Sequence, residues 1–143
     1  MIQVPVNYWA ILLAAIANMV LGFVWYGPLF GKTWMKLSGI TMGKIDTQKT
    51  KTNMNIGYAL AFLGSLLMAY VLEHSIVFAG AYLDVSGLFA GMMGGFWSWL
   101  GFIAPVTLGS VLWEGKPRKL WILMNGYYLI SLLLMGSILA VWM

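Results

Sequence analysis

Four long apolar segments divide the chain, and its polar residues are concentrated between them. The segments cover residues 8–26, 55–72, 85–113 and 120–142. Each is close to or longer than the roughly 20 residues that a helix needs to cross a bilayer. In lipid a helix satisfies its own backbone hydrogen bonds, whereas an open strand cannot. The pattern predicts an all-α polytopic membrane protein, whose residues 1–143 form a single four-helix transmembrane domain.

Composition supports this prediction and argues against a soluble domain. The chain is 62% hydrophobic and only 8% charged, whereas a soluble domain carries about 25% charged residues. It has no cysteine, so disulfides and thiolate metal sites are excluded. We expect no bound cofactor. The net charge of +4 does not indicate nucleic-acid binding, because the basic residues lie in two loops between apolar segments.

The positions of the basic residues predict an orientation. They are Lys32, Lys36, Lys44, Lys49 and Lys51 in the first connection, and Lys116, Arg118 and Lys119 in the third. The second connection, residues 73–84, has none and reads as a compact solvated cap that contains Glu73 and His74. Because basic loops stay in the cytoplasm, we expect both termini on the non-cytoplasmic side of an inner membrane.

The first connection is too long to be a simple turn. Apolar residues recur near helical spacing over residues 30–40, with lysines between them: Phe30, Lys32, Trp34, Lys36, Leu37 and Ile40. This pattern predicts a short helix on the inner membrane surface, with its lysines toward anionic headgroups. An irregular loop anchored by Trp34 is the alternative. Residues 41–52 read as a polar linker.

Small residues at intervals of three or four predict how the helices pack, because they let backbones approach closely. The rows are Ala10, Ala14, Asn18 and Gly22; Gly57, Ala61, Ser65 and Ala69; Gly87, Gly91 and Gly95; and Gly94, Ser98 and Gly101. Two rows on the third segment predict that this helix is central. Packing within one chain explains the rows most simply, and homo-oligomerisation through one of them is the alternative.

Polar chemistry inside the apolar segments is sparse. No ionisable residue lies in the middle of any segment, which disfavours proton-coupled export. We expect the amides of Asn18 and Asn125 to form hydrogen bonds across helix interfaces, although contact with a solute is possible for either. Pro105 removes the usual hydrogen-bond partner of the Gly101 carbonyl, which predicts a kink. His74 beside one carboxylate provides too few ligands for a metal site.

Two parts of the sequence resemble a known family. Residues 21–36 contain Trp25-Tyr-Gly-Pro28 followed by Phe30-Gly-Lys32 and Trp34, and the second part contains Trp99–Pro105, Trp113–Pro117 and Asn125-Gly-Tyr-Tyr128. Both are similar to the DUF1761 family (domain of unknown function 1761), which comprises small four-helix bacterial membrane proteins. The resemblance implies the same architecture and no assigned activity. It directs attention to Trp25, Tyr26, Pro28, Gly31, Lys32, Trp34, Pro105, Glu114 and Asn125.

Three functional hypotheses follow. The first is a non-catalytic membrane protein, either a homo-oligomer or an accessory subunit of a larger membrane complex, with membrane lipid as a partner. The second is a transporter or channel for a small neutral or lipidic solute, which would use the Pro105 kink and the two amides. The third is a membrane enzyme that acts on lipid, with Glu114 and Lys32 at the inner interface. We favour the first, because rows of small residues are abundant and chemically active groups are scarce.

Overall fold

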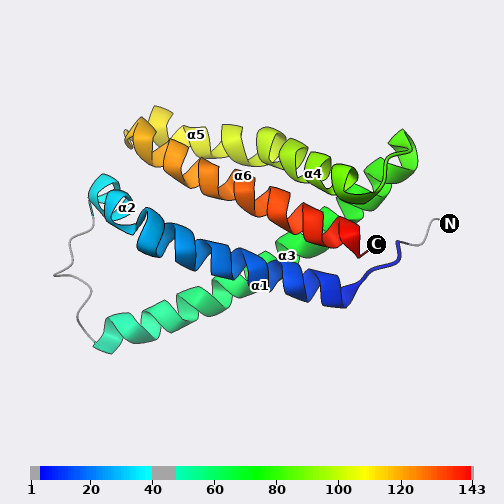
Figure 1. Ribbon diagram of the computed structural model, residues 1–143. Helices are drawn as coiled ribbons and strands as arrows, with labels where there is room; N and C mark the ends of the chain where they lie inside the picture. Colours follow the sequence, from blue (N-terminus) through cyan, green and yellow to red (C-terminus); the bar gives the residue numbers. More distant parts are fainter. Residues whose placement is uncertain (1–3, 40–47, 143) are drawn as a thin grey trace.

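The fold is known from a computed structural model that describes residues 4–39 and 48–142, and every regular element within these ranges is helical. The order is α1 (Tyr8–Val24), η1 (Trp25–Leu29), α2 (Gly31–Ser38), α3 (Gln48–Leu83), α4 (Gly87–Ser98), η3 (Trp99–Ile103), α5 (Ala104–Leu112) and α6 (Arg118–Val141) (Figure 1). η1 and η3 are short π-helical segments. Four stretches are long and apolar enough to cross a membrane: Tyr8–Leu29, Met54–Leu83, Gly87–Leu112 and Arg118–Val141. The four predicted apolar helices are therefore present.

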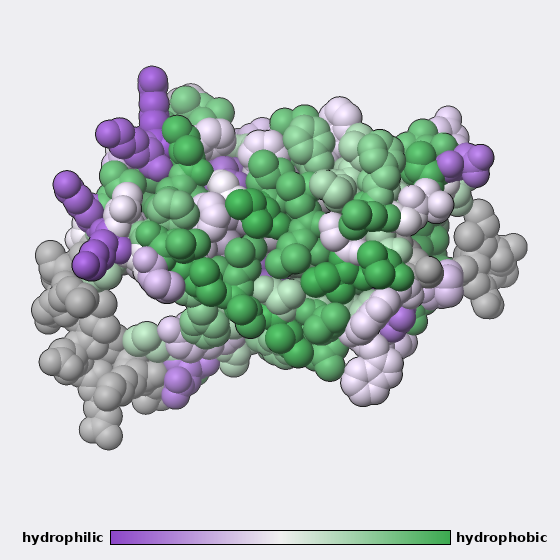
Figure 2. Space-filling model, in the orientation of Figure 1, coloured by the Kyte–Doolittle hydropathy of each residue, from purple (hydrophilic) through white to green (hydrophobic). Residues whose placement is uncertain are grey.

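The two ends of the bundle differ in character. Both termini lie at one end, and α2 and the α5–α6 loop lie at the other (Figure 1). Exposed basic side chains are gathered at that second end: Lys32, Lys36, Lys116, Arg118 and Lys119. Hydrophilic side chains cluster there, and an apolar band covers the middle of the visible face (Figure 2). We call these ends the terminal end and the basic end.

The central helix is α6, and the prediction that the third apolar helix is central was wrong. α6 packs against α1, α3, α4 and α5, and at the basic end it also contacts α2. α4 packs chiefly on α6 and to a smaller extent on α3. The small residues of the third helix did not reveal this arrangement, because the matching small residue, Gly136, lies within a leucine-rich stretch of α6.

Glycines bring α4 and α6 into backbone contact. A Cβ atom added to Gly91 would overlap the carbonyl oxygen of Gly136, and one added to Gly136 would overlap that of Gly91. Gly95 meets the carbonyl of Leu132 in the same way. The second row packs internally only in part: Gly94 faces Ile76 of α3, whereas Gly101 is exposed and an added Cβ atom there would meet nothing within 4 Å. The face that carries Gly91 and Gly95 is thus covered within the chain and is not available to a second copy.

α1 and α3 are in contact over only part of their length. Asn18 on α1 and Ser65 and Ala69 on α3 are buried, whereas Gly57 and Ala61 on α3 are exposed. The reason is visible in Figure 1, where α3 crosses α1 and diverges from it toward the basic end. The predicted row of small residues on α3 therefore packs over its second half only.

Several predicted boundaries differ from the structure. α3 begins at Gln48 and ends at Leu83, so residues 73–83 continue the helix and do not form the predicted cap. This stretch contains no proline, and the helix ends where Asp84 adopts a positive φ of 54°. Of the predicted linker, residues 48–52 are helical, and residues 40–47 lie outside the described ranges. The predicted short helix after the first segment is confirmed as α2, which ends at Ser38 and is capped by Gly39 with a φ of 69°.

Candidate functional site

Asn18 joins three helices inside the bundle. Its side chain is 5% exposed, and its Nδ2 atom donates a hydrogen bond to Ser65 Oγ on α3 at 2.7 Å. Its Oδ1 atom accepts hydrogen bonds from the hydroxyls of Tyr127, at 2.9 Å, and Ser131 on α6. Ser65 in turn donates to the carbonyl of Ala61 at 2.9 Å. Both the donor and the acceptor side of the amide are therefore used within the protein, as the sequence predicts for an inter-helix bond.

Asn125 forms a second polar contact, between α5 and α6. Its Nδ2 atom donates to Thr107 Oγ1 at 3.0 Å and to the Trp121 carbonyl at 3.1 Å. Thr107 Oγ1 also accepts from Trp121 Nε1 at 3.1 Å and donates to the Ile103 carbonyl at 2.7 Å. The Thr107 hydroxyl thus donates to a carbonyl in η3 and accepts from Trp121 near the start of α6, so it links these two elements.

Two prolines are associated with π-helical segments. Pro28 lies inside η1, and Pro105 follows η3. In η1, which includes Pro28, the amide of Phe30 donates to the carbonyl of Trp25 at 2.9 Å, five residues back. In η3 the amide of Ala104 donates to the carbonyl of Trp99, again five residues back, and Pro105 follows in the first turn of α5. α4, η3 and α5 form one continuous span, in which Pro105 has no amide to donate to a carbonyl of the preceding turn. The hydrogen-bond interruption predicted at Pro105 is therefore accommodated by a π turn.

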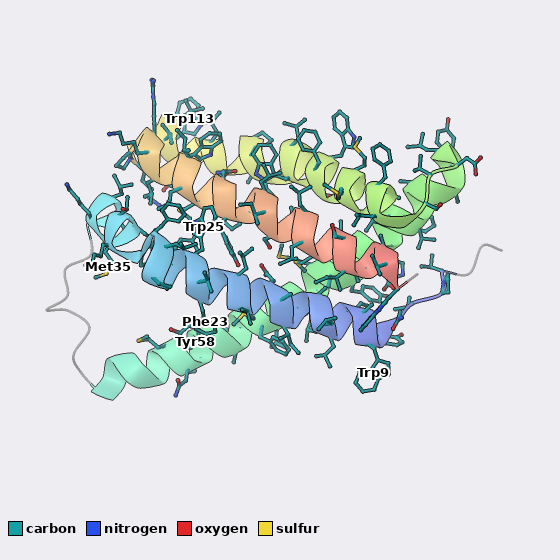
Figure 3. The ribbon with its side chains drawn as sticks, in the orientation of Figure 1. Trp9, Phe23, Trp25, Met35, Tyr58 and Trp113 are labelled. Atoms are coloured by element: carbon teal, nitrogen blue, oxygen red, sulfur yellow. The ribbon has the colours of Figure 1, made fainter. Side chains whose placement is uncertain are left out.

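Aromatic side chains from η1, α2 and α6 meet at the basic end. Trp25 Nε1 donates to the Leu123 carbonyl of α6 at 3.2 Å, and Figure 3 shows Trp25 directed toward α6. The ring of Tyr26 lies 5.5 Å from that of Trp34 and 5.2 Å from that of Tyr127, both edge to face. Gly31 is required beside them, because a Cβ atom there would lie 2.7 Å from the Tyr26 carbonyl oxygen.

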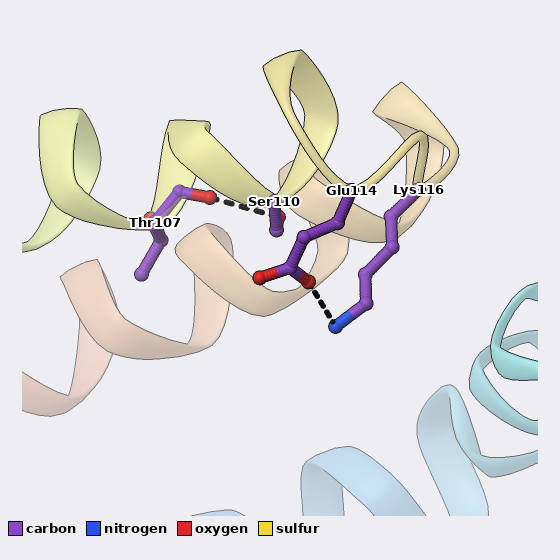
Figure 4. Close-up of polar contacts among 4 residues, drawn as sticks. All are labelled: Thr107, Ser110, Glu114 and Lys116. Carbon is purple, nitrogen blue, oxygen red and sulfur yellow. Dashed lines mark hydrogen bonds and ion pairs between the residues drawn. The ribbon is translucent and has the colours of Figure 1, made fainter.

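A cleft of about 860 Å³ lies between α2, α5 and the start of α6; we call it the loop cleft. Its polar wall includes Thr107, Ser110, Glu114, Lys116 and Asn125. Lys116 Nζ lies 2.9 Å from Glu114 Oε2, and both side chains are more than half exposed. Figure 4 shows this pair beside Ser110, whose hydroxyl donates to the Thr107 carbonyl at 2.8 Å.

A second cleft of about 770 Å³ opens where α3 diverges from α1; we call it the apolar cleft. It is lined by Met19, Gly22, Phe23, Tyr26, Gly27, Trp34, Met35, Met54, Tyr58, Ala61, Met124, Tyr127 and Tyr128. Phe23 and Tyr58 approach each other across it, with ring centroids 5.3 Å apart (Figure 3). Trp34, Met124 and Tyr128 line both clefts, so the two are neighbours with a common wall.

Comparison with known families places the chain. The model of the family described as "Protein of unknown function (DUF1761)" matches residues 9–140. The chain belongs to this family. No curated protein and no solved structure matches it.

The residues that carry the DUF1761 resemblance are largely brought together at the basic end. Trp25, Tyr26 and Trp34 form the aromatic cluster, and Trp34, Glu114 and Asn125 line the loop cleft. Pro28 lies inside the π segment η1, and Pro105 follows the π segment η3. Lys32 is exposed on α2, outside both clefts. Asn18, Gly91 and Gly95 lie elsewhere, in the packed part of the bundle.

Sequence reasoning missed several partners in this DUF1761 protein. Thr107, Trp121, Tyr127 and Ser131 complete the two amide contacts. Tyr127 and Ser131 are four residues apart on α6, so they share a face, and the Asn125-Gly-Tyr-Tyr128 segment could have indicated the first of them. Thr107 carried no such signal, because its position depends on the π turn before it.

Glu73 is the largest departure from expectation. Its side chain is 0% exposed, so the prediction of a solvated residue was wrong. Glu73 Oε1 accepts a hydrogen bond from the backbone amide of Asn7 at 2.9 Å, at the start of α1. Asn7 Nδ2 also donates to the Trp142 carbonyl at 3.2 Å. A carboxylate beside a helix N-terminus is favourable, and this contact ties α1, α3 and the end of α6 together.

Proposed function

We propose that this protein crosses the bacterial inner membrane four times, with the basic end in the cytoplasm and both termini outside. We further propose that it acts by binding and not by catalysis, as an oligomeric or accessory membrane subunit. Two features support insertion: the apolar surface of the four long helices and the gathering of basic side chains at one end (Figure 2). A charge distribution of this kind orients membrane proteins.

The binding role is supported by the hydrogen bonds that the two internal amides already make within the protein. Asn18 and Asn125 both make hydrogen bonds within the bundle. An amide that recognises a passing solute needs an unoccupied donor or acceptor directed into its path. These amides instead join helices, which favours a structural scaffold whose partners contact its surface.

Thiol labelling tests insertion and orientation, because the chain has no cysteine of its own. Ser86→Cys lies in the exposed connection between α3 and α4, and Lys119→Cys lies at the exposed start of α6. We expect an impermeant maleimide to label the first variant in spheroplasts and the second only after lysis. The reverse pattern, or labelling of both in spheroplasts, would refute the orientation.

Native mass spectrometry after gentle extraction tests the subunit role. We expect either a defined homo-oligomer or a stoichiometric complex with another membrane protein. The Gly91 face is occupied by α6, so Gly91→Ala should leave any such assembly intact in whatever protein still folds. A bare monomer recovered from the native membrane under several mild detergents would contradict the proposal.

A transporter of lipidic solutes is the second candidate, and the apolar cleft favours it. The cleft is lined by residues of both α1 and α3, including Phe23 and Tyr58, and α3 diverges from α1 toward the basic end (Figure 1). Transport predicts flux of a fluorescent lipid across proteoliposomes that Ala61→Phe abolishes, since Ala61 lines the cleft. Flux equal to that of empty liposomes would reject this candidate.

A further inference from the structure

Cationic side chains outnumber acids around the loop cleft. Lys116 lines it, Arg118 and Lys119 follow within three residues, and Lys36 is exposed on α2 next to the lining residues Leu37 and Ser38. Glu114 is the single acid that lines this cleft among the described residues. The mouth of the cleft therefore favours an anionic group.

The other half of the site is apolar and lies beside the first. The apolar cleft is lined by methionines, aromatic rings and small residues, and it shares Trp34, Met124 and Tyr128 with the loop cleft. Each cleft lies within the roughly 300–1,000 Å³ range of small-molecule sites. A ligand that fills both must have a charged part and a long apolar part joined at the common wall.

We propose that the two clefts together bind one anionic phospholipid of the cytoplasmic leaflet. Its phosphate lies against Lys116 in the loop cleft, and one acyl chain lies between α1 and α3 in the apolar cleft. This assignment rests on the proposed orientation, which places the basic end at the headgroups of that leaflet. The aromatic rings of Trp34 and Tyr128 at the common wall suit the boundary between headgroup and chain.

Glu114 has a specific part in this site. Its carboxylate holds Lys116 Nζ at 2.9 Å across the loop, so it occupies the ammonium group that the phosphate would contact. A bound phosphate competes with Glu114 for that group. Removal of the carboxylate should therefore strengthen lipid binding, whereas removal of the ammonium group should weaken it.

Lipid retention measured by native mass spectrometry tests the headgroup. The purified protein is mixed with phosphatidylglycerol or with phosphatidylcholine of the same chains. We expect one phosphatidylglycerol to be retained in preference to phosphatidylcholine. Lys116→Gln should lower this retention about fivefold, and Glu114→Gln should raise it about two- to fivefold.

Two control substitutions change the net charge by the same amount at positions outside both clefts. Lys32→Gln removes a basic residue of the same end that lines neither cleft. Asp84→Asn removes an acid at the terminal end, where asparagine tolerates the positive φ of 54°. We expect little change from either. Equal retention of the two lipids, or equal effects of Lys116→Gln and Lys32→Gln, would overturn the headgroup assignment.

The acyl chain is tested with a matched pair of substitutions on α3. Ala61→Phe places a ring in the apolar cleft, and Ala59→Phe places the same ring at an exposed position outside it. We expect only Ala61→Phe to reduce phosphatidylglycerol retention. No difference between the two variants would refute the chain site, and full displacement by millimolar inorganic phosphate would indicate a phosphate site without a lipid.

The outcome is separable from that of the proposed orientation. If thiol labelling places Lys119→Cys outside, both proposals fail, because the clefts would face the other leaflet. If the labelling agrees with the proposal and phosphatidylglycerol is not retained, only the lipid site is refuted.

Discussion

The terminal half and the basic half of this bundle are built from similar residues but in opposite ways. In the terminal half, glycines bring the backbones of α4 and α6 into contact, and buried alanines lie on α1 and α3. In the basic half the same residue types on α3, Gly57 and Ala61, face an open cleft or the outside. The π segment η1 connects α1 to α2 at the basic end, and η3 directly precedes α5, which runs toward that end (Figure 1). Both clefts lie in the basic half.

The difference teaches that small residues alone do not determine packing. Gly91 is buried because a second glycine, Gly136, lies opposite it. Gly57 and Gly64 meet nothing within 4 Å of an added Cβ atom. The terminal half holds the bundle together, and the basic half leaves surface for a ligand. Substitutions matched for chemistry can test this division.

The largest effect is expected where α4 and α6 touch. Gly91→Leu forces a side chain into the backbone of Gly136 and should destabilise the protein by about 3 kcal/mol or more. Gly64→Leu, where there is open space, should change stability by less than about 0.5 kcal/mol. Unfolding in mixed detergent micelles measures both. Equal stability of the two variants would remove the distinction between the halves.

A smaller effect is expected where the halves meet, at Asn18. Asn18→Leu keeps the branched shape of the side chain but leaves the hydroxyls of Tyr127 and Ser131 without the Oδ1 acceptor, at a cost of about 2 kcal/mol. Asn55→Leu makes the same change at an exposed site on α3. The same unfolding assay should separate them. An unchanged midpoint for Asn18→Leu would show that this contact is dispensable.

Within the basic half we expect the Thr107 contact to contribute less. Thr107→Val removes the oxygen that accepts from Asn125 and Trp121 and should cost about 1 kcal/mol. Thr33→Val on the exposed side of α2 is the control. A loss as large as that of Asn18→Leu would mean that the Thr107 contact holds the basic half as firmly as Asn18 holds the boundary between the halves.

The smallest effect is expected inside the apolar cleft. Ala61→Phe adds a ring to open space and should change the free energy of unfolding by less than about 0.5 kcal/mol. The same variant is expected to lose lipid retention, so stability and binding should respond independently. A large destabilisation would show that the cleft closes in the folded protein.

The sequence was sufficient for the features that depend on local pattern. Apolar length predicted the four long helices, and the spacing of Trp34 and Leu37 predicted α2. The two amides were correctly singled out as inter-helix contacts, because a polar group in an apolar segment requires a partner.

Features that depend on a distant partner were not predictable in the same way. Glu73 looked like the start of a polar loop, and only the approach of Asn7 from α1 explains its burial. The central place of α6 depends on the match between Gly136 and Gly91, which sequence spacing on either helix does not reveal. The clefts arise from the divergence of α3, a property of the whole bundle.

The π turn of η3 has a consequence for how this chain can change in length. A π turn accommodates one residue more than a regular α-helix would, and each residue rotates a helix by about 100°. Deletion of a single residue between Trp99 and Ile103 would therefore restore the regular helix and leave Thr107 facing Asn125, because the π turn already absorbs the extra residue. An insertion or deletion of one residue in the regular helix α5 would instead rotate the residues beyond it by about 100°, and it would alter which side chains line the loop cleft without any substitution in the cleft itself.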